Sequence, residues 1–137
     1  MKWRDKMSRQ EARDRAFKLI FEYVFTKEID DELMNEYIGE SDVSGEEDYI
    51  KDVYFGVSQK FDYLSEKIEK LSIGFASHRI FKVDFAILLL ASYEIEFKKD
   101  IPVKVSINEA CNLAKIYSTE KSVGFVNGIL AKMIEEK

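Results

Sequence analysis

Basic side chains gather near the amino-terminal end of the chain. Residues 1–20 contain seven lysines and arginines and three acidic residues, so this segment has a net charge of +4. Arg9 and Arg13 are four residues apart, and in a helix their guanidinium groups would share one face. Three further bases precede them on a short arm: Lys2, Arg4 and Lys6. Guanidinium groups and the free amides of a helix amino terminus both bind anions, so the segment predicts a phosphate site, with an ordinary solvated face as the alternative.

A second candidate binding feature is Phe125, in the last helix that the sequence predicts. At 100° per residue, this ring projects about 120° from the centre of that helix's apolar stripe. Lys121, Ser122 and Asn127 are its polar neighbours. An exposed ring among such donors can stack on and hydrogen-bond the bases of single-stranded RNA, whereas the alternative is a ring that fills a gap against another helix. We expect Phe125 to lie beside the basic amino-terminal segment, so that one strand contacts both.

The residue types that most enzymes and metal sites need are scarce. Cys111 and His78 are the chain's one cysteine and one histidine, which excludes a disulfide framework and a Cys/His zinc site. The sequence contains no glycine-rich phosphate loop, no GxSxG elbow and no HExxH motif. We therefore expect no catalytic residue, no cofactor and no metal, and we expect a binding function instead.

Length and composition indicate one compact domain over residues 1–137. The chain has a mass of 16.0 kDa, with 46% hydrophobic and 34% charged residues. This balance allows a buried core and argues against intrinsic disorder. The six glycines and single proline favour helices joined by short links over a turn-rich β fold.

The overall charge of −5 limits the kinds of partner and location that we expect. Residues 28–52 alone carry eleven acidic side chains and one lysine, so the mean field of the chain repels phosphate and disfavours non-specific binding to polyanions. The longest apolar stretch is Phe85–Ala91, far shorter than the roughly 20 residues of a membrane-spanning helix. The amino terminus lacks a secretory signal. We expect a cytoplasmic protein that makes no membrane contact.

Apolar periodicity and capping motifs predict an all-α protein of seven helices. Ser8 and Glu11 have the spacing of a capping box, so the first helix should begin near Arg9. Residues 77–97 form the most apolar predicted helix, which we place at the centre because a helix apolar nearly all round must be surrounded by others. The last helix should run from about residue 121 to residue 135.

Two further pairs repeat the capping-box spacing. Ser44 with Glu47 and Ser106 with Glu109 predict two more helix starts. Gly124 lies four residues before Gly128 in the last helix, and this spacing favours close packing against a neighbouring helix.

Three stretches of the chain resemble one known family. The first is the arginine-containing opening helix, residues 8–21, and the second is DFAILLLASYE, residues 84–94. The most specific is the ordered pattern IPxxVxINEA, LAK and FVNGxL, which spans residues 101–130. Together they resemble the family of the transcription antitermination factor NusB, over nearly the whole chain.

This resemblance implies a fold of two small helical subdomains packed as one RNA-binding domain. It also implies binding of boxA RNA together with NusE, a small-subunit ribosomal protein, within an RNA polymerase complex that resists termination, notably on ribosomal RNA operons. The family's RNA contacts correspond here to Arg9, Arg13, Lys121, Ser122, Phe125 and Asn127. Its NusE contact corresponds to Asp84 and its neighbours, among them Phe85.

Two alternatives to this function remain open at the level of the sequence. One is an RNA-targeting module like the NusB-like domain fused to RNA cytosine methyltransferases. The other is a stand-alone helical homo-oligomer that acts as a scaffold, since some NusB-like proteins self-associate, and a homodimer could mask the RNA face.

Overall fold

The computed structural model describes residues 7–39, 45–73 and 80–136 of the chain. The helices in these ranges are α1 (Arg9–Thr26), α2 (Asp31–Ile38), α3 (Glu47–Gln59), α4 (Phe61–Leu71), α5 (Lys82–Phe97), α6 (Val103–Tyr117) and α7 (Glu120–Glu135). The prediction of an all-α protein with seven helices is therefore confirmed for the part of the chain that the structure describes.

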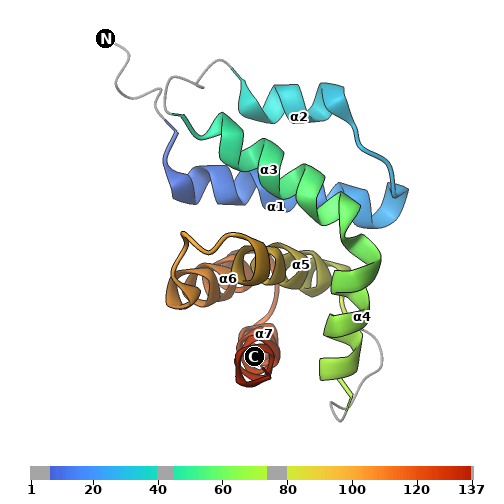
Figure 1. Ribbon diagram of the computed structural model, residues 1–137, viewed down its shortest axis with the longest axis vertical. Coiled ribbons are helices and arrows are strands. Elements are labelled where there is room, and N and C mark those ends of the chain that lie inside the picture. The colour runs from blue at the N-terminus through green and yellow to red at the C-terminus, as the bar shows by residue number, and fades with distance from the viewer. Residues whose placement is uncertain (1–6, 40–44, 74–79, 137) are drawn as a thin grey trace.

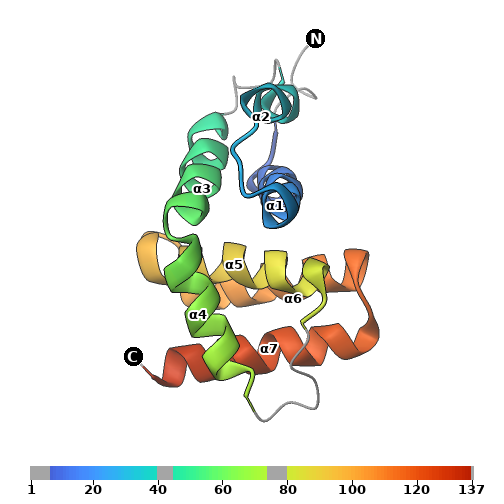
Figure 2. The same ribbon diagram turned by 90° about the vertical axis from the view of Figure 1, so that its right-hand side faces the viewer.

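Helices α5 and α6 form the middle of the molecule. Figures 1 and 2 show α1, α2 and α3 on one side of this pair and α7 on the opposite side. Helix α4 continues from α3 and packs against α5 and α7. Helix α5 contacts α1, α3, α4, α6 and α7, so both groups of helices share it as their common core element.

The composition of α5 explains its central place. Every side chain from Ala86 to Ile95 is buried, including those of Ser92 and Glu94. A helix with apolar residues on all sides lowers its free energy only when other helices surround it. The predicted central helix is confirmed, although it begins at Lys82 rather than at residue 77, and residues 77–79 lie outside the described residues.

The capping box at the start of α1 is confirmed. The Ser8 hydroxyl accepts the amide of Glu11 at 3.0 Å, and the Glu11 carboxylate accepts the amide of Ser8 at 2.9 Å. Met7 is buried directly before this cap. The cap satisfies two amides that would otherwise lack a partner, and it fixes the position of Arg9 at the first turn.

The capping box predicted at Ser106 and Glu109 is wrong. Helix α6 begins at Val103, with Pro102 as its N-cap residue, so Ser106 lies inside the helix. The φ of Pro102 is −59°, which is close to the helical value, and a proline has no amide that needs a partner at this point. Ser106 instead donates its hydroxyl to Glu94 at 2.7 Å.

The start of α3 also differs from its prediction. The helix begins at Glu47, and Glu46 occupies the N-cap position without a side-chain cap. Ser44 lies outside the described residues. Over the described residues, none of the helices is both long enough and apolar enough to cross a membrane.

Candidate nucleic-acid interface

Arg9 is accessible to solvent at the predicted RNA surface. Its side chain is 42% exposed on the first turn of α1, and its Nε donates to the Glu46 carboxylate. Its guanidinium also lies 4.3 Å from the centre of the Tyr49 ring. The ring and the carboxylate orient Arg9 while a large part of the side chain stays in contact with solvent, where it can meet a phosphate.

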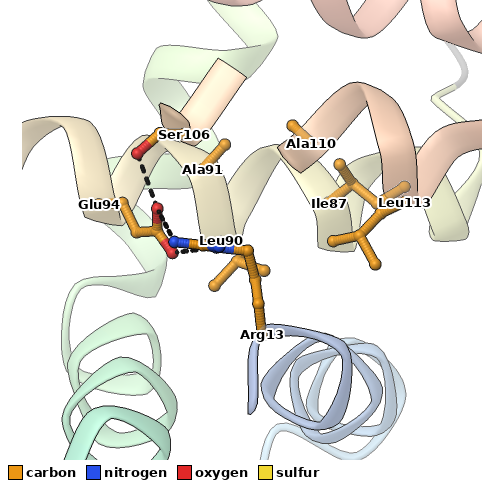
Figure 3. A pocket seen from close by; sticks show the side chains of 8 residues that line it. All are labelled: Arg13, Ile87, Leu90, Ala91, Glu94, Ser106, Ala110 and Leu113. Atoms are coloured by element: carbon orange, nitrogen blue, oxygen red, sulfur yellow. Dashed lines mark hydrogen bonds and ion pairs between the residues drawn. The ribbon is translucent and has the colours of Figure 1, made fainter. Parts of the chain in front are cut away.

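Arg13 does not reach the surface, and its predicted phosphate contact is wrong. Only 4% of the residue is exposed. Its Nε and Nη2 atoms donate to the two carboxylate oxygens of Glu94 at 2.8 Å and 3.2 Å, and Figure 3 shows the side chain extending from α1 towards α5. Burial by itself lowers the pKa of Arg13, but the hydrogen bond to Glu94 and the nearby acidic groups outweigh that effect and raise this pKa.

Glu94 accepts hydrogen bonds from three surrounding helices. Besides Arg13, it accepts the hydroxyl of Ser106 on α6 at 2.7 Å and the phenol of Tyr49 on α3. Tyr49 is buried, and this burial together with the Glu94 charge raises the pKa of its phenol well above the usual value. A buried carboxylate needs such a complete set of donors because its desolvation is costly. The network joins α1, α3, α5 and α6, and its role is structural.

The four-residue spacing of Arg9 and Arg13 does place both on one helix face, as predicted. That face turns towards α3, since both guanidinium groups lie over the Tyr49 ring, at 4.3 Å and 5.6 Å from its centre. The signal that sequence reasoning missed is Glu94, a carboxylate that closely follows the apolar stretch of the central helix. Once buried, such a residue needs hydrogen-bond donors, and Arg13 supplies two of them together with a positive charge.

The residues predicted on α7 divide into surface and interior positions. Lys121 and Asn127 are exposed. Phe125 is half-buried and packs in part against the hydrophobic core, so it is neither the fully outward-facing ring that was predicted nor a sealed core residue. Ser122 is 3% exposed, so its predicted contact with RNA is wrong.

Ser122 belongs to a second buried network, which is centred on Asp84. Two serine hydroxyls donate to this carboxylate, each at 2.7 Å: Ser118 of the α6–α7 connection to Oδ1, and Ser122 of the first turn of α7 to Oδ2. Asp84 is 3% exposed, so the prediction that it forms part of a partner-binding surface is wrong. Its neighbour Phe85 is half-buried, with its ring edge-on to that of Phe61 at 6.1 Å.

The opening of α5 nevertheless exposes apolar side chains. Phe81, the N-cap residue of α5, is 61% exposed, and Ile73, just after α4, is 68% exposed. Exposed large apolar side chains of this kind mark candidate protein contacts. The candidate partner surface is therefore formed by Phe81 and Phe85 rather than by Asp84.

The helices that carry Arg9 and Phe125 do not lie side by side. Figures 1 and 2 place α1 and α7 on opposite sides of the α5–α6 pair. The carboxyl end of α6 contacts α1, because Tyr117 donates its hydroxyl to Asp14 at 2.5 Å and packs its ring against Phe17. The same end of α6 leads into α7.

Three predicted RNA residues, Lys2, Arg4 and Lys6, lie outside the described residues, as does His78. Across the part of the chain that the structure describes, no cluster of three or more His, Cys, Asp or Glu side chains could hold a metal ion. Cys111 is half-buried, and this burial raises the pKa of its thiol, which disfavours the reactive thiolate.

The fold and the site together define a helical binding protein: its buried polar networks hold helices together, and its exposed groups are a cation, an amide and partly exposed rings. The NusB family model matches residues 10–135, and the chain belongs to this family of transcription antitermination proteins, which is not a family of enzymes.

Individual relatives agree with this assignment over nearly the full chain. The transcription antitermination protein NusB of Acetivibrio thermocellus is 42% identical, with 96% of this chain and 91% of that protein covered. The same protein of Clostridium acetobutylicum is 38% identical, with 96% and 100% covered.

Two solved structures agree in fold. NusB of T. maritima superposes with a TM-score of 0.85 at 32% identity, over 96% of this chain and 93% of that one. A crystal structure of the antitermination factors NusB and NusE in complex with dsRNA has a TM-score of 0.81 at 25% identity, over 94% and 97% of the chains.

Proposed function

We propose that this chain binds boxA-type RNA together with NusE in the cytoplasm, as part of an RNA polymerase antitermination complex, notably on ribosomal RNA operons. The observation that carries the proposal is the fit of 94% of the chain to a relative solved with both NusE and RNA. The proposal takes residues 1–137 as a single NusB-like RNA-binding domain.

The RNA surface in this proposal combines a cationic end with a stacking end. Its members are Lys2, Arg4, Lys6, Arg9, Lys121, Phe125 and Asn127. Support comes from the exposure of Arg9, Lys121 and Asn127 and from the partial exposure of Phe125. The cations attract phosphate, while the exposed part of the ring and the Asn127 amide contact bases.

NusE has a defined task in this proposal. The chain carries a net charge of −5, so its affinity for RNA alone is low. A partner seated on Phe81 and Phe85 extends the positive surface and shares the cost of ordering the strand. RNA binding by the pair is then much tighter than binding by either protein.

The experiment that tests the proposal is fluorescence anisotropy with a labelled boxA-like RNA and a scrambled control, each with and without NusE. We expect tight binding only for the boxA-like RNA with NusE present. Equal affinity for both RNAs would contradict the proposal. Light scattering on the same samples reports self-association, and a dimer that ignores RNA at low salt would favour a scaffold instead.

Arg9→Ala tests the cationic end of the surface. Loss of one phosphate contact should weaken binding about fivefold and flatten the salt dependence of log K by about 0.7, the value for one contact to a single strand. The measurement is anisotropy at several salt concentrations with NusE present.

The matched control is Lys104→Ala, which removes an exposed cation of α6 outside the proposed surface. We expect its salt slope to equal that of the unmodified chain. A slope that Arg9→Ala leaves unchanged would exclude Arg9 as a phosphate contact.

A further inference from the structure

We propose that Asp84 is a positioning residue for RNA binding, because its buried carboxylate holds the first turn of α7 and thereby sets the positions of Lys121 and Phe125. The inference rests on the proposed function, since it assigns those two residues to the RNA surface. It goes further by naming a buried residue of another helix on which that surface depends.

Both carboxylate oxygens of Asp84 accept hydrogen bonds from the region where α6 ends and α7 begins. Ser118 donates to Oδ1 from the connecting turn, and Ser122 donates to Oδ2 from the first turn of α7. The Ser118 hydroxyl also lies 2.8 Å from the Ser122 oxygen, so the two serines and the carboxylate form one hydrogen-bonded cluster. Three points are thus fixed at one place: the opening of α5, the turn and the start of α7.

The start of α7 is also ordered by local contacts. Thr119 is the N-cap residue of α7, and its hydroxyl accepts the amide of Ser122 at 3.1 Å. Thr119 therefore orders the backbone of the first turn locally, but it does not connect that turn to the rest of the protein. Asp84 provides the polar connection, through the side chain of the same Ser122.

Two helix amino termini stabilise the negative charge of Asp84. Asp84 is the third residue of α5, and Ser122 is the third residue of α7. The partial positive charge at the start of a helix favours a carboxylate within the first turn. Among the described residues, Asp84 forms no ion pair with a lysine or arginine, so the hydroxyl donors and these helix termini take the place of a cation.

The bond between Ser122 and Asp84 holds the part of α7 that carries two residues of the proposed RNA surface. Lys121 directly precedes Ser122, and Phe125 follows it by three residues, within one helical turn. Without the bond from Ser122 to Asp84, the first turn of α7 can pivot about its apolar contacts further along the helix, at Val126 and Ile129. A shift of about 1 Å is enough to misplace a stacking ring or a cation.

The same turn of α5 carries the candidate partner surface. Phe81 is its N-cap residue and Phe85 directly follows Asp84. Asp84 therefore lies between the surface proposed for NusE and the surface proposed for RNA, and its side chain is buried. Removal of Asp84 should affect RNA binding far more than NusE binding, because its bonds go to α7.

The test compares Asp84→Ala, Asp84→Asn and Ser118→Ala in the full chain with NusE and a boxA-like RNA. We expect Asp84→Ala to weaken RNA binding about tenfold and Ser118→Ala by a smaller factor, the scale of one or two lost hydrogen bonds. Asp84→Asn should restore most of the affinity, because its amide can still bond both hydroxyls. NusE affinity, measured by calorimetry, should stay within about twofold in all three.

Hydrogen exchange separates positioning from a general loss of stability. In Asp84→Ala, the amides of the first turns of α7 should exchange faster while those of α1 keep their protection. Phe81→Ala is the reciprocal control, and it should weaken NusE binding without faster exchange in α7. If Asp84→Ala does not fold, Ser118→Ala carries the same comparison with one bond removed.

The outcomes distinguish this inference from the proposed function. If the unmodified chain with NusE does not prefer the boxA-like RNA, the proposed function fails. If the unmodified chain shows that preference, and both Asp84→Ala and Ser118→Ala bind the boxA-like RNA as tightly as the unmodified chain does, the positioning role of Asp84 is overturned. Equal losses of RNA and NusE affinity would overturn it too, since they would indicate a structural role alone.

Discussion

Arg13 and Glu94 form a buried ion pair between α1 and α5, with side-chain exposures of 5% and 1%. The carboxylate also accepts the hydroxyls of Ser106 and Tyr49, so its removal from water is compensated by several donors. The pair cannot contact RNA without breaking this network. Its contribution is to fix how α1, with Arg9 at its first turn, sits on α5.

Arg13→Ala should therefore reduce stability rather than RNA recognition. It leaves the Glu94 charge buried without a cation, which costs about 3–5 kcal/mol of unfolding free energy. Urea unfolding followed by circular dichroism measures this change. Arg9→Ala is the matched control, because its partly exposed ion pair with Glu46 contributes about 1 kcal/mol or less. A similarly small loss for Arg13→Ala would contradict the structural role.

At the scale of the helices, two glycines have opposite surroundings. A Cβ on Gly56 of α3 would overlap the ring of Tyr93 on α5, which is held in place by a hydrogen bond to Asp52. A Cβ on Gly124 of α7 would meet nothing within 4 Å. The predicted close packing at Gly124 is therefore wrong, and the close approach of helices that glycine permits occurs at Gly56.

The same substitution should have opposite effects at these two positions. Gly56→Ala forces the Tyr93 ring or the α3 backbone to move and should destabilise the protein by about 1–3 kcal/mol. Gly124→Ala should stabilise it by about 0.5–1 kcal/mol, because alanine loses less conformational freedom in a helix. Thermal unfolding of both variants measures these changes in stability. If both variants were stabilised, or both destabilised, the result would contradict the prediction.

The helix starts show which local signals the sequence carries. Ser8 and Glu11 predicted the start of α1 correctly because both partners of the capping box are local and solvent-exposed. Ser106 has the same spacing to Glu109, yet the buried Glu94 recruits its hydroxyl. A capping motif is reliable only where no tertiary partner competes for the side chain.

At the scale of the whole molecule, α5 is shared by two groups of helices. It packs against α1 and α3 on one side and against α7 on the opposite side, with α6 beside it, as Figures 1 and 2 show, and it also contacts α4. The Arg13–Glu94 pair adds a polar connection between the two groups. Both groups therefore bury apolar side chains against the same helix.

Unfolding should therefore be a single cooperative transition. Circular dichroism at 222 nm and tyrosine fluorescence should give the same midpoint in urea, since the loss of α5 contacts exposes both groups together. An earlier transition in one signal, with hydrogen exchange showing α1, α2 and α3 opening alone, would contradict this expectation.

The sequence by itself determined the helices, the central place of α5, the family and the absence of the motifs that enzymes need. These properties follow from periodicity, composition and ordered motifs, which are local and can be counted along the chain. The sequence also identified Arg9, Lys121 and Asn127, whose exposure agrees with a role at the surface.

Only the tertiary structure decided which polar side chains face water. Arg13, Asp84 and Ser122 have polar side chains of the kinds found at binding surfaces, yet each is buried and hydrogen-bonded to a partner distant in sequence. Helical periodicity gives the direction of a side chain relative to its own helix. It does not say which neighbouring helix occupies that direction, and the burial of a charge depends on that neighbour.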